Sequence, residues 1–154
     1  MNITEVEKED LEIVKRLIEL EFSYFNSSVE NLRERLENPN IFLFKLVERN
    51  GIIGFVDLEL LDSIGRVNAI SVVKHRRGKR LGEHLLDFGI NFLKEKNVSE
   101  IKLIVKAENR VAKSLYGKFG FHSTGILSQK IENSTVEEMS LPLKSIFSRP
   151  RDLS

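Results

Sequence analysis

The first part of the chain has a helical spacing of apolar residues. Between Leu11 and Phe25 apolar side chains recur every three or four residues, which is typical of an amphipathic helix. Ser27-Ser28-Val29-Glu30 has the spacing of a capping box and predicts a second, shorter helix that ends by Asn38-Pro39. The β-forming residues 2–6 predict a short strand ahead of both helices.

Runs of β-forming residues follow these helices, and turn signals separate them. Residues 41–47 and 52–61 are joined by Asn50-Gly51, which is a strong short-range signal for a hairpin. After a turn at residues 62–65, residues 66–73 read as a further strand. The three strands should pair as an antiparallel meander.

The second half of the chain alternates helices with strands. Residues 81–96 carry a wide apolar face, so this helix should lie against a sheet. A strand over residues 99–105 should then run parallel to the strand before the helix, which makes a β–α–β unit. Asn109 precedes a short helix that ends at Gly120 in the manner of a C-cap. The last predicted element is a hairpin of two strands, 121–131 and 136–141.

Together these elements predict an α/β (α+β) fold. It consists of a mixed, mainly antiparallel central sheet of six or seven strands with helices on both faces. A chain of 154 residues is about one domain long. We therefore expect a single domain over residues 1–143, followed by a C-terminal tail over residues 144–154.

Composition narrows the chemistry that this fold can carry. The 24 Lys and Arg residues nearly balance the 23 Asp and Glu residues, and cysteine is absent. The chain can therefore form no disulfide framework, thiolate metal site or cysteine nucleophile. His75, His84 and His122 lack a ligand-like spacing, so no metal site is expected. No apolar run approaches 18 residues, and we expect a cytoplasmic protein without a membrane span.

Against this balanced charge, residues 74–80 form a local basic cluster between a predicted strand and a predicted helix. It could be a solvated turn or a patch that binds nucleic acid. The spacing of Gly78 and Gly82, with no hydroxyl residue after them, does not match the P-loop pattern. The same glycines, at the start of a helix, would let the backbone approach a pyrophosphate closely. The cluster alone does not separate these alternatives.

A second stretch, Asn109 to Phe121, favours the pyrophosphate. It reads Asn-Arg-Val-Ala-Lys-Ser-Leu-Tyr-Gly-Lys-Phe-Gly-Phe. With Arg77-Gly78-Lys79-Arg80-Leu81-Gly82, it resembles the paired motifs of the GNAT family of N-acetyltransferases, near the ribosomal-protein and N-terminal alanine acetyltransferases. The likeness covers about residues 66–141, and the order of elements agrees with the family's. The resemblance implies transfer of an acetyl group from acetyl-CoA to an amine, without a metal.

The resemblance also implies roles for individual residues. The backbone at Val72 and Val73 would pair with pantetheine, and Asn109 would bond the same arm or simply cap its helix. Tyr116 would be the general acid toward the CoA thiolate, and it also counts among the cofactor contacts. Lys118 would reach a phosphate or only solvent. The remaining cofactor-binding residues would be those of the basic loop: Arg76, Arg77, Gly78, Lys79, Arg80, Leu81 and Gly82.

Two departures from the family pattern bear on mechanism. Arg80 stands where the family usually has glycine, and Lys74 stands where it usually has proline. Residues 66–71, where many members carry a glutamate base, contain no carboxylate. The proton acceptor is left open among Asp57, Glu59, Glu108 and water.

The leading function from the sequence is direct acetyl transfer from acetyl-CoA to a primary amine. A protein or peptide α-amine is slightly favoured over a small-molecule amine as the acceptor, and a homodimer is compatible with this interpretation. A non-catalytic acyl-CoA-binding module is the alternative. A nucleic-acid-binding protein that uses residues 74–80 is less favoured.

Overall fold

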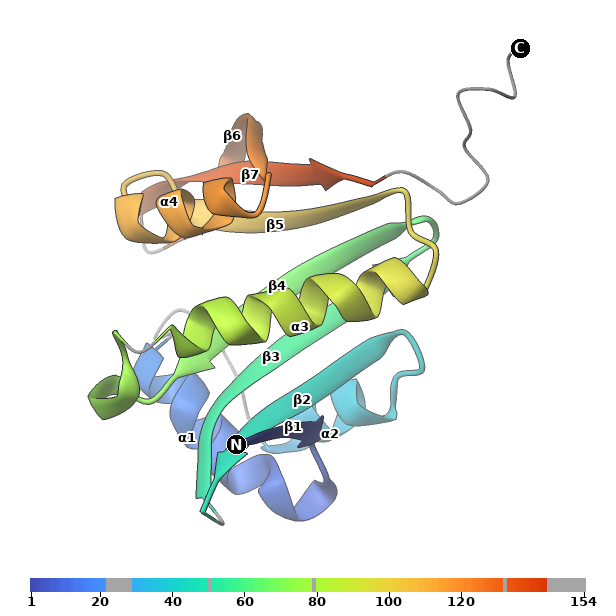
Figure 1. Ribbon diagram of the computed structural model, residues 1–154, viewed down its shortest axis with the longest axis vertical. Coiled ribbons are helices and arrows are strands. Elements are labelled where there is room, and N and C mark those ends of the chain that lie inside the picture. Colours follow the sequence, from blue (N-terminus) through green and yellow to red (C-terminus); the bar gives the residue numbers. More distant parts are fainter. Residues whose placement is uncertain (22–28, 50, 79, 132, 144–154) are drawn as a thin grey trace. The chain divides into compact units, whose positions relative to one another are not determined.

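The computed structural model describes residues 1–21, 29–49, 51–78, 80–131 and 133–143 (Figure 1). The chain divides into two compact units. The first consists of Met1–Glu59 and Val67–Gly89, and the second of Leu60–Arg66 and Ile90–Ser154. The predicted tail over residues 144–154 lies outside the described residues, and a single domain over residues 1–143 stays a prediction.

Four strands make the sheet of the first unit. They are β1 (Asn2–Glu5), β2 (Ile41–Glu48) and the larger parts of β3 (Gly51–Leu61) and β4 (Ile64–Val72), and they neighbour one another in that order. β2 pairs antiparallel with both β1 and β3, so that Phe44 lies opposite Glu5 on one side and Val56 on the other. The predicted hairpin between β2 and β3 is confirmed, with the second strand beginning at Gly51.

Helices cover both faces of this sheet. A 3-10 turn, η1 (Lys8–Asp10), leads into α1 (Leu11–Glu21), and α2 (Val29–Glu37) follows. The inner side chains of α1 and α2 form one core with apolar residues of β2 and β3, including Leu43 and Phe55. The third helix, α3 (Leu81–Glu95), packs on the other face, where the rings of Phe88 and Phe44 are 4.8 Å apart. Figure 1 shows α1 and α2 behind β2 and β3, and α3 in front.

The alternation along β2 explains why both faces are buried. Ile41 and Leu43 point to the α1–α2 core, while Phe44 points to α3, and all three are nearly inaccessible to solvent. Burying such a side chain contributes about 1.5–3 kcal/mol.

Three strands of the second unit pair antiparallel with one another. β7 (Ser134–Pro142) pairs with β5 (Glu100–Lys106) on one edge and with β6 (His122–Ile131) on the other. The helix α4 (Arg110–Lys118) lies between β5 and β6 in the sequence, and Gly120, with φ +99°, ends it as predicted. The turn between β6 and β7 is shorter than predicted, because β7 begins at Ser134 instead of Val136.

These elements confirm the predicted fold class. The described residues contain seven strands, mostly in antiparallel pairs, and four α helices. None of the helices in this part of the chain is long and apolar enough to span a membrane.

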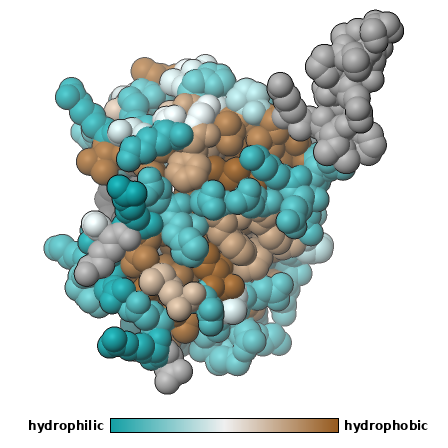
Figure 2. Space-filling model, in the orientation of Figure 1, coloured by the Kyte–Doolittle hydropathy of each residue, from teal (hydrophilic) through white to brown (hydrophobic). Residues whose placement is uncertain are grey.

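The surface is mixed in character. Figure 2 shows hydrophilic residues over much of one face, with hydrophobic residues between them. Leu20, Val111 and Ile126 are among the large apolar side chains that are mostly exposed. Scattered apolar residues of this kind are ordinary on protein surfaces and identify no binding face by themselves.

Candidate acetyltransferase site

The predicted basic loop leaves the end of β4 through a tight turn. β4 ends at Val72, a 3-10 turn, η2, follows over Lys74–Arg76, and α3 begins at Leu81. The Val73 N–H donates to the carbonyl oxygen of Ile53 at 2.9 Å, and the Val73 carbonyl accepts from the Arg76 N–H at 3.0 Å. The Val73 N–H is therefore engaged within the first unit. Any N–H at this point that contacts a cofactor has to come from another residue.

The loop then uses two left-handed backbone positions before the helix. Gly78 has φ +83° and Arg80 has φ +60°. Arg80 thus adopts the left-handed backbone conformation that favours glycine. This conformation costs a residue with a side chain about 1–2 kcal/mol. Its carbonyl oxygen accepts from the His84 N–H at 3.0 Å, so the strained residue also begins the hydrogen bonding of α3.

Space lies open above both glycines of the loop. A Cβ atom added at Gly78 or at Gly82 would meet no atom within 4 Å. The glycine at position 82 lies in the first turn of α3, where backbone N–H groups have no partners within the helix. An anion could therefore approach the backbone here at the positive end of a helix of 15 residues.

The cations of the loop differ in what they contact. Both Nη atoms of Arg76 are bonded to Glu48 at the end of β2, with Nη1–Oε1 at 2.7 Å and Nη2–Oε2 at 2.8 Å. The Nε of Arg77 donates to the Val72 carbonyl at 3.2 Å. The side chain of Arg80 is 88% exposed and lies 3.9 Å from Glu83. Lys79, also predicted to bind the cofactor, lies outside the described residues.

The second motif is held by side-chain contacts within its own unit. Oδ1 of Asn109 accepts from the Ala112 N–H at 3.1 Å, so Asn109 is the N-cap of α4. Nζ of Lys113 donates to the Ala107 carbonyl at 3.1 Å and to Oε1 of Glu137 on β7 at 2.9 Å. These contacts fix α4 against the ends of β5 and β7.

Tyr116 lies at the end of the second turn of this helix. It is half-buried, and its ring meets Phe121 edge-on with a centroid distance of 6.0 Å. The carbonyl oxygen of Tyr116 accepts from the N–H groups of Phe119 and Phe121, which closes the end of the helix. Lys118, two residues later, is exposed.

Two of the predicted proton acceptors, Asp57 and Glu59, lie together in the first unit. Asp57 is 4% exposed and accepts two hydrogen bonds from Arg35, each at 2.8 Å. Nδ2 of Asn68 donates to Asp57 at 3.2 Å and to Glu59 at 3.0 Å. Burial raises the pKa of Asp57, while the hydrogen bonds from Arg35 and Asn68 oppose that rise. Glu59 is only partly buried and receives one of these bonds.

The third predicted acceptor, Glu108, belongs to the second unit. It is exposed, and its Oε1 accepts from the Ser134 hydroxyl at 2.9 Å. Sequence reasoning missed Arg35, which ties Asp57 to α2. Nothing marks this arginine in the sequence, because it is one of several charged residues on a mostly polar helix.

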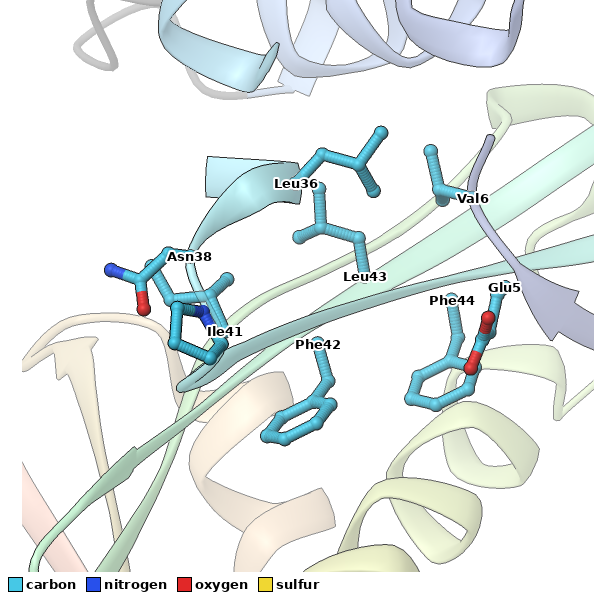
Figure 3. Close-up of a pocket in the computed structure, with 9 residues that line it drawn as sticks. Glu5, Val6, Leu36, Asn38, Ile41, Phe42, Leu43 and Phe44 are labelled. Carbon is cyan, nitrogen blue, oxygen red and sulfur yellow. The ribbon is translucent and has the colours of Figure 1, made fainter. Parts of the chain in front are cut away.

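Among the described residues, no group of three or more His, Cys, Asp or Glu side chains is arranged to hold a metal ion. A pocket of about 240 Å³ lies at the start of β2 and was not predicted. Figure 3 shows Leu36, Leu43 and Val6 on one side of the strand, with Phe42 and Phe44 on the other. The residues that line this pocket belong to neither motif.

Comparison with known proteins gives a family for these features. A family model described as an acetyltransferase (GNAT) domain matches residues 7–141. A protein of Bacillus subtilis (strain 168), named as a candidate ribosomal protein bS18-alanine N-acetyltransferase, is 30% identical over 120 residues. That alignment covers 75% of this chain and 79% of the relative.

Two solved structures share the fold. The ribosomal-protein-S18-alanine N-acetyltransferase from Escherichia coli superposes with a TM-score of 0.80 at 22% identity, over 92% of each chain. The PaiA N-acetyltransferase from Thermoplasma acidophilum, solved in complex with coenzyme A, superposes with a TM-score of 0.69 at 20% identity. It covers 92% of this chain and 98% of that chain. On the family match and the relative's identity, the chain belongs to the GNAT family of N-acetyltransferases.

Proposed function

We propose that the chain transfers an acetyl group from acetyl-CoA directly to a primary amine. The observation that carries this proposal is the strand–loop–helix at residues 72–82, whose two glycines leave open space at the N-terminus of α3. A CoA pyrophosphate carries negative charge, and unpaired N–H groups at a helix N-terminus suit it. The family match over residues 7–141 supports the same cofactor.

The cations for the pyrophosphate come from the same loop. The Nε of Arg77 donates to the Val72 carbonyl, which places this charged guanidinium at the start of the loop. Arg80 extends from the left-handed position with most of its side chain exposed. Lys79 would add a third cation. Charge-assisted hydrogen bonds from these residues to phosphate oxygens are stronger than neutral ones.

Asn109 can serve both roles that the sequence left open. Its Oδ1 is used as the cap of α4, and its Nδ2 group remains a donor of the kind that a pantetheine carbonyl accepts. The cap fixes the orientation of the amide, so one side chain can hold the helix and the cofactor arm.

The reaction requires two proton movements. The neutral amine nitrogen attacks the thioester carbonyl carbon, the C–S bond breaks, and the departing thiolate takes a proton. A phenol with a reference pKa of about 10 can supply that proton to a thiolate whose conjugate thiol has a reference pKa of about 8.5. We assign this step to Tyr116, which α4 holds against Phe121.

The amine proton needs a separate acceptor. Asp57 is a poor candidate, because both of its oxygens are bonded to Arg35 and it is nearly inaccessible. Glu59 and Glu108 each keep part of the carboxylate exposed. We propose that one of these two, acting through water, takes the proton.

The acceptor proposed is the α-amine of a protein or peptide. An α-amino group has a reference pKa of about 8, against about 10.4 for a lysine side chain, so it needs less help from a base. The name of the Bacillus subtilis relative, a ribosomal protein alanine N-acetyltransferase, supports this class. Small-molecule amines are the alternative class.

The test is release of free CoA thiol from acetyl-CoA with a panel of amines. The panel contains peptides with a free α-amine, the same peptides with a blocked α-amine, polyamines and amino acids. We expect release with the free α-amine peptides and none with the blocked ones. Binding of acetyl-CoA without release for any amine would instead favour the acyl-CoA-binding module. Absence of CoA binding, with salt-dependent DNA binding, would favour a nucleic-acid-binding protein.

A further inference from the structure

We infer that the ion pair between Glu48 and Arg76 positions the cofactor loop, so that Arg76 is a positioning residue and not a phosphate ligand. This inference rests on the proposed function, because it assigns a role within the proposed CoA-binding loop. It concerns two residues that are 28 positions apart in the sequence.

The geometry of the pair commits the guanidinium of Arg76. Its two Nη atoms meet the two carboxylate oxygens of Glu48 at 2.7 and 2.8 Å, a bidentate arrangement that fixes orientation as well as distance. The side chains of Arg76 and Glu48 are only 27% and 24% exposed. The remaining donor, Nε of Arg76, is buried, and it has no hydrogen-bond partner among the described residues.

The pair adds a side-chain contact where the backbone already joins the same two segments through the hydrogen bond from the Val73 N–H to Ile53 on β3. Glu48 is the last residue of β2, and Arg76 is the last residue of η2, two positions before the left-handed Gly78. The backbone hydrogen bonds of η2 are local, through the carbonyl oxygens of Val73 and Lys74. The ion pair therefore holds η2, beyond the last backbone bond to β3, against the end of β2.

For Arg76 to bind a phosphate, it would have to leave Glu48. That exchange would strand a half-buried carboxylate without its partner, which is costly. It would also bring the negative charge of Glu48 near the incoming phosphate. Arg80, whose side chain is 88% exposed, can meet a phosphate without this exchange.

The two possible roles of Arg76 predict opposite changes in CoA affinity for the substitution Glu48→Gln. If Arg76 binds phosphate, Glu48→Gln frees the guanidinium and removes a nearby negative charge, so CoA should bind more tightly. If the pair positions the loop, Glu48→Gln loosens the loop, and CoA should bind more weakly. A loop displaced from its binding geometry should lose about tenfold in affinity.

The experiment is calorimetric titration of CoA into wild type, Glu48→Gln, Arg76→Gln and the double variant. We expect a similar increase in Kd for both single variants and no further increase in the double variant, because both remove the same interaction. With saturating acetyl-CoA, kcat should be unchanged, so that the defect appears in KM. The matched control is Glu30→Gln, which removes an exposed ion pair with Arg33 on α2 and should leave Kd unchanged.

Unchanged or tighter CoA binding by Glu48→Gln would overturn the inference, and so would additive effects in the double variant. Thermal unfolding of each variant shows that titrations are made on folded protein. The exchanged pair, Glu48→Arg with Arg76→Glu, restores the opposite charges and should bind CoA more tightly than either single glutamine variant. Wild-type protein that binds no CoA would contradict the proposed function itself, which separates the two failures.

Discussion

The two motif segments of this chain are held in different ways. The loop at residues 73–82 depends mainly on its backbone, which has two left-handed residues and two glycines with open space beside them. One side-chain ion pair holds its start. The helix α4 depends on side chains, through the Asn109 cap and the Lys113–Glu137 contact. Substitutions in the loop should therefore change cofactor affinity, whereas those on α4 should change turnover.

The largest expected effect is that of Tyr116→Phe. Loss of the phenolic proton donor should lower kcat about 100-fold, because general acid catalysis contributes at least that much. The KM for acetyl-CoA should change little, since the ring and its contact with Phe121 remain. Steady-state kinetics with the best amine of the panel measures both constants.

The control for Tyr116→Phe is Val111→Ala on the same helix, whose side chain is 83% exposed. It should leave kcat and KM unchanged. An unaltered kcat for Tyr116→Phe would show that Tyr116 is not the general acid. It would also contradict the expectation that substitutions on α4 change turnover.

Gly82→Ala should affect affinity and stability in opposite directions. The new methyl group meets no atom of the protein, and alanine favours the helix, so the free energy of unfolding should not fall. The methyl group would instead occupy the space proposed for the pyrophosphate, and CoA affinity should fall about tenfold, or 1.4 kcal/mol. Calorimetry and thermal unfolding on the same sample check both. Unchanged affinity would place the phosphates elsewhere.

Arg80→Gly should stabilise the protein slightly. Glycine relieves the left-handed strain at φ +60°, and its greater freedom in the unfolded chain offsets part of that gain, which leaves about 0.5 kcal/mol. Denaturant unfolding measures the change. Lys96→Gly, at an exposed position beyond the end of α3, is the comparison, and it should not stabilise the protein. A loss of stability for Arg80→Gly would show that the arginine side chain compensates for the strain.

The smallest expected effect is a pH dependence at α4. The hydrogen bond from Lys113 lowers the pKa of Glu137. A carboxyl group whose pKa is lower in the folded state stabilises the fold above its unfolded pKa, about 4.3, and loses that contribution as the pH falls through the folded value. Wild type should therefore have a higher Tm than Lys113→Met at pH 7, and the difference should shrink below about pH 4. A difference that is constant with pH would assign the effect to packing.

Local patterns predicted most of the fold. The Asn50-Gly51 signal, the spacing of apolar residues in 81–96 and the cap at Asn109 each lie within a few residues of the structure that they specify. The sequence identified Arg80 as a departure from the family pattern, but it did not predict the left-handed backbone at this residue.

The contacts that define the site were harder to foresee. Arg76 looked like a phosphate ligand beside Arg77, and only the fold brings Glu48 to it. Arg35 and Asp57 are 22 positions apart on a helix and a strand, with no spacing that links them. The Val73 N–H, expected at the cofactor, is used by Ile53 because β4 continues its pairing with β3 to this point. Each of these contacts joins residues that are far apart in the sequence. Composition and periodicity do not indicate which distant residues will meet.

The most direct test of the account compares CoA with pantetheine, which lacks the pyrophosphate and the nucleotide, in calorimetric titrations of wild-type protein. We predict that CoA binds and that pantetheine binds at least 100-fold more weakly, since charge-assisted phosphate contacts supply much of the affinity. The CoA affinity should also fall as salt is added. Equal binding of the two ligands, or no binding of CoA, would contradict the assignment of residues 72–82 as the pyrophosphate site.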